Sequence, residues 1–533
     1  MAIFGFHVIL TLLSASVFGK IQGRLSLCDI FVFKGLYYYL LEGSLFPRLV
    51  KHKRVQQQKG NYQGGNGKRR GINTSQKATN NKSSIEKMGE EQKDRLIRLP
   101  LNLNALEGVP FFDSLIWTFN YSCFALFVFV LSDLYNLVFP ENKDLNASMI
   151  WTFCALILQI HILLNIAFEK VSLAELFPER NTLICATGLF FLGSLLFNAF
   201  ADQFLDIEIS KVSLAELFPE RNTLICATGL FFLGSLLFNA FADQFLDIEI
   251  SKGYLNFINS LNDFLQEHGF QPLFSSSSRS PLLFLVCLAL IFSIILSAFF
   301  FPLLQYTSLY FDFFEEEEEK ERGFKNIFVS CVLHFSFLAP VGVLLLFLRP
   351  IVEQILETQF ITQDQLKSLR LLALFITLFA RIYASRICLQ TFLDKPKKVL
   401  IEYSFRNLKD EEKQRKVANY ASYACTAALQ HYMPIAIILS IGLILKNLGL
   451  ELSFKGNKSG IADVSFSSLL YQSTTPPSTT TTTLLDKKFI LLNILFSKEF
   501  HEPLWTLALT TLICGQCLIC LFGVIMRKTS RGR

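Results

Sequence analysis

Long apolar runs separated by polar stretches are the feature that most constrains this chain. Of its 533 residues, 51% are hydrophobic and 55 are phenylalanine. A soluble chain of this length would divide into several domains with polar surfaces. Runs of about 18 or more apolar residues are instead long enough to cross a hydrocarbon core about 30 Å thick. The sequence therefore predicts an integral membrane protein.

Ten segments are candidates for membrane-spanning helices. Hydrocarbon offers the backbone no hydrogen-bond partner, so each span is expected to be a helix that satisfies its own peptide groups. We therefore predict an all-α, polytopic integral membrane helical bundle with about 8–10 transmembrane helices. The candidates are Ala2–Phe18, Leu115–Leu131 with an extension to Val138, Met149–Phe168, Leu183–Phe200, Leu224–Phe241, Pro281–Leu304, Ile327–Leu348, Leu369–Leu393, Ala418–Leu445 and Leu504–Ile525.

One of these runs occurs twice. The 41 residues from Lys170 to Ser210 recur, letter for letter, from Lys211 to Ser251. Solenoid repeats diverge and need three or more units, whereas inverted-repeat transporters repeat several helices at once. Perfect identity instead favours a recent exon duplication or an artefact of the gene model.

Composition divides the chain into five regions. Between Arg48 and Arg98 there are 14 Lys or Arg against 4 Asp or Glu, which predicts a disordered basic loop. Such a loop beside a membrane sets topology or contacts anionic lipids, and we expect no nucleic-acid partner. The regions are an N-terminal hydrophobic segment, either a retained helix or a signal peptide, with an interfacial stretch (1–46), the basic loop (47–98), a transmembrane bundle (99–445), a Ser/Thr-rich loop (446–503) and a last helix with a basic tail (504–533).

Positive charge predicts the orientation of the chain. The tail after Ile525 is basic and is expected to be cytosolic, which places the glycosylation candidate Asn457 outside. If one copy of the repeat spans, the candidate Asn146 is also outside and the basic loop is cytosolic. If both copies span, these two assignments are reversed. The charges favour one spanning copy, whereas the sequons at Asn73 and Asn81 favour two.

Two connecting segments have a more mixed pattern. Apolar residues between Tyr254 and Leu265 mark one broad face of a helix, which predicts a helix lying at the membrane interface. The basic segment Asp394–Lys416 is expected to behave similarly. The acidic run Glu315–Glu319 is expected to be solvated.

Arginines inside a span are the strongest candidates for a functional site. Arg370, Arg381 and Arg386 lie in or at the edges of one candidate span. Arg370 and Arg381 share a helical face, because 11 residues make three turns plus about 20°. Charges at membrane depth mark a site or a paired interior position, unless Arg370 and Arg386 extend to opposite interfaces and only Arg381 is buried. Candidate partners of Arg381 are Asp113, Asp133 and Gln430.

Other polar residues in the spans extend this candidate site. A lone membrane histidine such as His161, His334 or His431 is more often an interhelical hydrogen-bond partner than a ligand. Gln430 and His431 lie close to Pro434, whose kink could open a polar pocket. The predicted intramembrane polar site comprises Arg370, Arg381, Arg386, His161, Gln430 and His431.

The sequence gives no positive case for catalysis. Cys514, Cys517 and Cys520 form a CxxCxxC run, but a fourth ligand is missing, and one helix would spread the thiols along its flank. We find no nucleophile elbow, zinc-protease motif, Walker loop or dinucleotide fingerprint. We therefore expect no catalytic residue, no metal and no cofactor.

Several of these stretches resemble the transmembrane protein 161 family. They include NASMIW ending at Trp151, ERNTLICATGLFF, FLAPVGVLLLFLRPI, LRLLALFITLFARIYASRICLQTFL and ALQHYMPIAIILSIGLILKNLG. The resemblance implies a polytopic membrane protein with one copy of the ERNT segment, so the tandem copy is a departure. It also implies no enzymatic activity and a role in regulating cation currents and membrane excitability, or in cellular stress responses.

We therefore expect a non-enzymatic modulator of cation currents, in the plasma membrane or an endomembrane, with the lipid bilayer and ion-channel subunits as partners. Two alternatives stay open. In the first, the protein is a membrane scaffold that acts in cellular stress response and whose arginines only join helices. In the second, it is a solute transporter.

Overall fold

The computed structural model describes most of the hydrophobic runs and the segments that join them. The described residues are 6–21, 27–41, 96–101, 106–138, 148–168, 220–267, 281–318, 324–357, 361–405, 410–448 and 497–531. They belong to two compact units. Unit 1 comprises Met1–Leu25, Thr118–Ser385 and Gln430–Arg533, and unit 2 comprises Ser26–Trp117 and Arg386–Leu429.

Apolar runs form helices throughout the described residues, as the sequence predicts, and the chain is an all-α polytopic membrane protein whose apolar helix surfaces contact the lipid bilayer. Within the described residues, seven helices are long and apolar enough to cross a membrane. The predicted run Leu183–Phe200 lies outside the described residues, and the first run forms α1 (Phe6–Ile21), which is shorter than the seven. The seven are α5 (Phe112–Val138), α6 (Ser148–Phe168), α10 (Leu282–Glu318), α11 (Phe324–Leu345), α13 (Gln363–Phe405), α15 (Ala424–Asn447) and α18 (Lys498–Arg531).

Four further helices connect or accompany these spans. The second copy of the repeat forms α8 (Glu220–Phe245), and the amphipathic segment forms α9 (Ile250–Glu267), as its pattern predicts. The other two are α12 (Arg349–Glu357) and α14 (Asp410–Ser422). Helix α13 continues well past the predicted span because intrahelical hydrogen bonds do not end where hydrocarbon ends, and Lys and Glu are good helix formers. The predicted run Ala418–Leu445 is divided at Tyr423, between α14 and α15.

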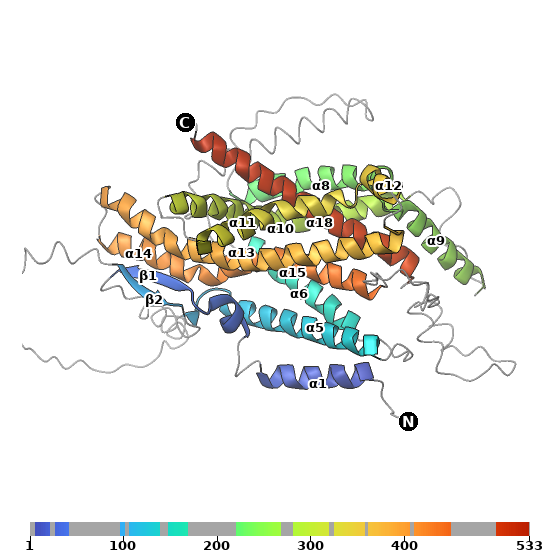
Figure 1. Ribbon diagram of the computed structural model, residues 1–533, viewed down its shortest axis with the longest axis horizontal. Coiled ribbons are helices and arrows are strands. Elements are labelled where there is room, and N and C mark those ends of the chain that lie inside the picture. Colours follow the sequence, from blue (N-terminus) through green and yellow to red (C-terminus); the bar gives the residue numbers. More distant parts are fainter. Residues whose placement is uncertain are drawn as a thin grey trace, which may run out of the picture. The chain divides into compact units, whose positions relative to one another are not determined.

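Helices α8, α10 and α18 pack side by side in unit 1 (Figure 1). Two glycines of α18 allow α10 to come close, because a Cβ at Gly515 would overlap the Leu296 side chain and one at Gly523 would lie 3.0 Å from the Cβ of Thr307. Small residues at such contacts let transmembrane helices gain van der Waals packing where no hydrophobic effect drives association.

Contacts at both ends show that α10 and α18 are parallel. Phe284 and Phe500, near their starts, have ring centroids 5.7 Å apart. Near their ends, Arg527 donates to Asp312 at 2.6 Å and to Glu315 at 2.8 Å. Glu315 is therefore paired rather than simply solvated. We refer to these two ends of unit 1 as the Phe500 end and the Arg527 end.

The directions of α6 and α8 bear on the repeat. Helix α6 begins at the Phe500 end, where Phe153 packs edge-on against Trp505 and Ser148 donates to Asn447 at 3.4 Å. Helix α8 runs against α10, and its Asn239 donates to the Leu285 carbonyl at 3.4 Å, so it ends there. Helix α6 thus ends, and α8 begins, at the Arg527 end.

Unit 2 contains a small sheet that the hydropathy pattern does not predict. Strands β1 (Tyr37–Leu41) and β2 (Leu96–Pro100) pair antiparallel, with Tyr37 opposite Pro100. Gln390 of α13 holds the edge of β1, accepting from the Tyr37 amide at 3.0 Å and donating to the Tyr37 carbonyl at 3.2 Å. The Arg98 guanidinium lies 3.9 Å from the centroid of the Tyr37 ring. A π-helical turn, η1 (Asp29–Phe33), precedes β1.

Substitution of the two glycines tests the close approach of α18 to α10. Gly515→Ala and Gly523→Ala should each lower stability by about 1–3 kcal/mol, because the added methyl group overpacks the contact. Gly342→Ala is the matched control, since a Cβ at Gly342 meets nothing within 4 Å. Thermal unfolding in detergent, followed by size-exclusion, is the measurement, and equal melting temperatures for all three variants would contradict this packing.

Glycosylation tests the directions of the helices. The segment joining α5 to α6 and the segment joining α15 to α18 both connect helix ends at the Phe500 end, since Asp133 and Lys446 pair at 2.5 Å. Asn146→Gln and Asn457→Gln should therefore each remove one glycan shift on a gel, whereas Asn73→Gln and Asn81→Gln should change nothing. Glycan on Asn73 or Asn81, and none on Asn146, would reverse the assignment.

Candidate functional site

Helix α13 carries the buried charges of unit 1. Arg370 and Arg381 are buried, with 7% and 6% of their surface exposed, and both lie on the interior side of the helix, as their spacing predicts. They are separated by about 16 Å along the axis, at 1.5 Å per residue. They therefore belong to two different environments, one at the Phe500 end and one inside the bundle.

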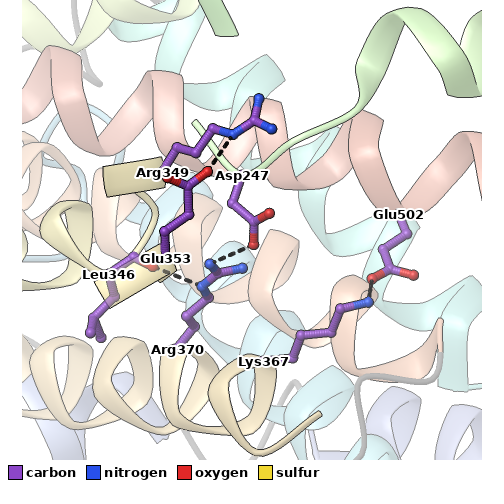
Figure 2. A network of polar contacts seen from close by, with 7 residues as sticks. All are labelled: Asp247, Leu346, Arg349, Glu353, Lys367, Arg370 and Glu502. Atoms are coloured by element: carbon purple, nitrogen blue, oxygen red, sulfur yellow. Dashed lines mark hydrogen bonds and ion pairs between the residues drawn. The ribbon is translucent and has the colours of Figure 1, made fainter. Parts of the chain in front are cut away.

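Arg370 has three described partners at the Phe500 end. Its Nη2 donates to Asp247 Oδ2 at 2.9 Å, and its Nε donates to the Leu346 carbonyl at 2.9 Å (Figure 2). The guanidinium carbon also lies 4.8 Å from the centroid of the Phe347 ring. The charge is thus compensated by one carboxylate, one peptide dipole and one aromatic face.

A short elbow between α8 and α9, residues 246–249, positions Asp247. The Asp247 amide donates to the Phe347 carbonyl at 3.0 Å, in a bridge that pairs Leu246 with Leu348. Asp243 caps α9 by accepting from the Ile250 amide at 2.9 Å and from the Ser251 hydroxyl. The elbow is therefore fixed at both sides before Arg370 reaches it.

One turn before Arg370, Lys367 contacts a different helix. Its Nζ donates to Glu502 Oε1 of α18 at 2.6 Å, and Figure 2 shows the two α13 cations directed to these separate partners. A cavity of about 270 Å³ lies beside both pairs. Its lining includes the apolar residues Leu371, Leu445 and Leu509 and the acidic residues Asp247, Glu249, Glu499 and Glu502.

The charges around this cavity are mixed, with an excess of carboxylates. Lys252 donates to Glu249 at 2.9 Å, and this hydrogen bond raises the pKa of Lys252 above its ordinary value. Asn256 donates to Glu499 at 3.3 Å. A cavity lined by both apolar and charged residues can accommodate a small polar or charged solute.

Arg381 lies in a different environment. Its Nη1 donates to Gln516 Oε1 of α18 at 2.8 Å, and its guanidinium carbon lies 4.9 Å from the centroid of the Tyr306 ring. The Cys520 thiol also contacts it. Among the described residues, no carboxylate lies within 4 Å of this guanidinium. Gln516, which is 2% exposed, has no described partner for its Nε2.

The partner of Arg381 is therefore none of the three candidates. Gln516 takes this place in the structure, whereas Asp133 pairs with Lys446 and the Oε1 of Gln430 has no hydrogen-bond partner among the described residues. The sequence did contain a signal for Gln516, because it is the single amide in the apolar run LICGQCLICLF. Hydropathy gives no means of assigning it to a helix 135 residues away in the chain.

The other predicted site residues lie elsewhere. His161 is exposed on α6, where its Nε2 contacts the Asn165 amide at 3.2 Å. Gln430 and His431 are buried in α15. Arg386 belongs to unit 2 and donates to the Lys34 carbonyl. Asn146 and Asn457 lie outside the described residues.

The described residues contain no evident site for a metal ion or a cofactor. No group of three or more His, Cys, Asp or Glu side chains among the described residues is arranged to hold a metal ion. Cys514, Cys517 and Cys520 lie along α18 as free thiols. What the described arrangement offers chemically is a charged cavity at one end and a buried guanidinium inside the bundle.

A double-mutant cycle tests the Arg370–Asp247 pair. Because Arg370 is buried, Arg370→Gln and Asp247→Asn should show a coupling energy of roughly 1 kcal/mol or more. The exposed pair Arg349–Glu353, at 3.1 Å on α12, is the matched control and should give about 0.5 kcal/mol or less. Thermal unfolding in detergent gives both values, and equal coupling in the two pairs would show that burial adds nothing.

Comparison with known proteins identifies the family. The family model described as predicted transmembrane protein 161AB matches residues 2–216 and 212–529. The first match contains the first copy of the repeat, and the second contains nearly all of the second copy. The two matches overlap at residues 212–216, close to the start of the second copy. No solved structure matches the chain. Because the family model covers nearly its whole length, as the resemblance predicted, the chain belongs to the transmembrane protein 161AB family.

Proposed function

We propose that this integral membrane protein is a non-enzymatic modulator of cation currents, acting on ion-channel subunits in the plasma membrane or an endomembrane. The observation that carries the proposal is Arg381, a buried guanidinium with no carboxylate within 4 Å among the described residues. A charge at membrane depth is costly and is usually found where it serves a function. Here it is solvated by an amide and a ring.

The two arginines of α13 differ in what they can do. Asp247 compensates Arg370, so that pair carries little net charge. Arg381 keeps a positive field inside the bundle, and one elementary charge across the membrane responds to potential by about 2.3 kcal/mol per 100 mV. This field would raise the energy of a cation that passes close to Arg381, as positive groups do in selective channels. These properties support modulation of cation flow.

Other features of the chain support one further proposed contact and two other candidate functions. The basic loop 47–98, of which only residues 96–98 at the start of β2 are among the described residues, is proposed to contact anionic lipids through its excess of Lys and Arg. A second candidate function, solute transport, is favoured by the cavity of about 270 Å³ beside Lys367 and Arg370. A scaffold role would use the arginines only as interhelical contacts.

Whole-cell currents separate these functions. Arg381→Leu removes the buried charge and should change the cation current that the protein modulates, whereas Arg381→Lys should preserve most of the effect. Arg349→Leu, which removes an exposed arginine of α12, is the matched control and should leave the current unchanged. If surface expression is normal and both Arg381 variants leave currents untouched, the modulator function of this arginine is wrong.

Reconstitution in liposomes is the second arm of that experiment. Purified protein that modulates a partner should give no cation flux alone. Cation flux in liposomes would instead show direct conduction. Uptake of a small charged solute that is lost in Lys367→Gln would favour transport through the cavity.

A further inference from the structure

The chain has two identical segments, and α8 with its elbow shows the second of them seated in unit 1. Each contact described for α8 is equally available to the first copy. Asn198 stands where Asn239 does, and Asp206 stands where Asp247 does. The side chains of α8 therefore do not explain why the second copy, rather than the first, occupies this position in unit 1. The reason must lie in residues that the copies do not share.

Chain connectivity does not supply it. Seating the second copy leaves residues 169–219 between α6 and α8, whereas seating the first would leave only residues 169–178. Seating the first copy would move those 41 residues into the connection that leads to α10, and closure entropy grows only slowly with length. The lengths of the connections therefore do not select the second copy.

The copies differ first at Gly253. A Cβ at this position would lie 2.8 Å from the backbone carbonyl oxygen of Glu499, in the first turn of α18. A backbone atom cannot move aside as the tip of a side chain can. The residue that follows the first copy at the equivalent position is Val212. A branched side chain there would push α9 away from α18.

The rest of α9 differs in the same sense. The Tyr254 ring stacks on Phe284 at 4.9 Å, and the Phe257 ring stacks on Phe500 at 4.6 Å. After the first copy, Ser213 and Glu216 stand at these positions. Glu216 would place a carboxylate against the face of the Phe500 ring, on which the Phe257 ring stacks. Burying this charge is unfavourable unless it is solvated.

Proline makes the difference larger. Ser260 lies in the interior of α9, and the equivalent residue after the first copy is Pro219. A proline in a helix interior removes a hydrogen bond and clashes with the preceding turn. A helix that started at Ile209, as α9 starts at Ile250, could not continue through this position as α9 does.

We propose that α9 selects which copy enters the bundle, through Gly253, Tyr254, Phe257 and Ser260. The second copy is seated because Gly253, Tyr254 and Phe257 follow it directly and dock on α10 and α18, while Ser260 lets the helix continue. The first copy is rejected from this position by Val212, Glu216 and Pro219. This selection does not depend on the proposed effect on cation currents.

Disulfide trapping at the elbow tests the proposal. Leu246 and Leu348 face each other in an antiparallel bridge, and bridged residues have Cα atoms about 4.5–5.5 Å apart, within disulfide range. The Leu246→Cys/Leu348→Cys variant should form an intramolecular disulfide on mild oxidation. The matched variant Leu205→Cys/Leu348→Cys, which moves the same change to the first copy, should give a yield more than about tenfold lower.

A deletion provides the positive control. Removing residues 211–251 places Lys252 and Gly253 directly after Ser210, so the first copy is then followed by α9. In that chain, Leu205→Cys/Leu348→Cys should form the disulfide as efficiently as Leu246→Cys/Leu348→Cys does in the full chain. Peptide mass spectrometry identifies the linked residues against the background of native cysteines, and single variants set the baseline.

Transplanting the selecting residues completes the test. In the full chain with Leu205→Cys/Leu348→Cys, the changes Val212→Gly, Ser213→Tyr, Glu216→Phe and Pro219→Ser should raise the yield at least several-fold. If the yield does not rise, while the deletion control forms the disulfide, α9 does not select the copy. Equal trapping of the two copies in the otherwise unchanged full chain would overturn the proposal as well.

Discussion

The close parallel contact between α10 and α18 is the interaction on which the rest of unit 1 depends. It requires glycine at positions 515 and 523, because the side chains of Leu296 and Thr307 on α10 lie directly against these residues of α18. In a bilayer, this kind of fit replaces the hydrophobic effect as the source of helix association. Once α10 and α18 are parallel, α8 packs against α10 in the opposite direction, and its end brings the elbow to the start of α18.

Polar groups at the Phe500 end then follow from this packing. The elbow presents Asp247 to Arg370, and the start of α18 presents Glu502 to Lys367. Two cations one turn apart on α13 thereby join three elements and line a cavity. Inside the bundle the same helix presents Arg381 to an amide instead of a carboxylate. One helix therefore carries a compensated and an uncompensated charge.

The sequence predicted the helices well because hydrophobic length and backbone hydrogen bonding decide them together. The amphipathic pattern around Tyr254 likewise predicted α9, and the spacing of Arg370 and Arg381 predicted their common face. Partner choice was beyond its reach. Gln516 and Asp247 are far from their arginines in the chain, and hydropathy does not encode which helices become neighbours.

Strands and helix limits were missed for related reasons. The strands β1 and β2 are five residues each, too short for an alternating pattern to be distinctive, and a long basic segment separates them. The limits of α13 exceed the predicted span because hydropathy measures contact with hydrocarbon rather than helical hydrogen bonding. These misses concern local geometry at the edges of the apolar runs.

Different kinds of interaction hold α10 and α18 together at their two ends. Aromatic rings meet at one end, through Phe284 and Phe500, whereas Arg527 grips Asp312 and Glu315 at the other. Dissolved ions screen partly exposed charges but leave contacts between aromatic rings almost unaffected. A rise in ionic strength will therefore weaken the contact at the Arg527 end and leave the aromatic contact at the Phe500 end almost unchanged. The two ends of one helix pair thus respond differently to salt.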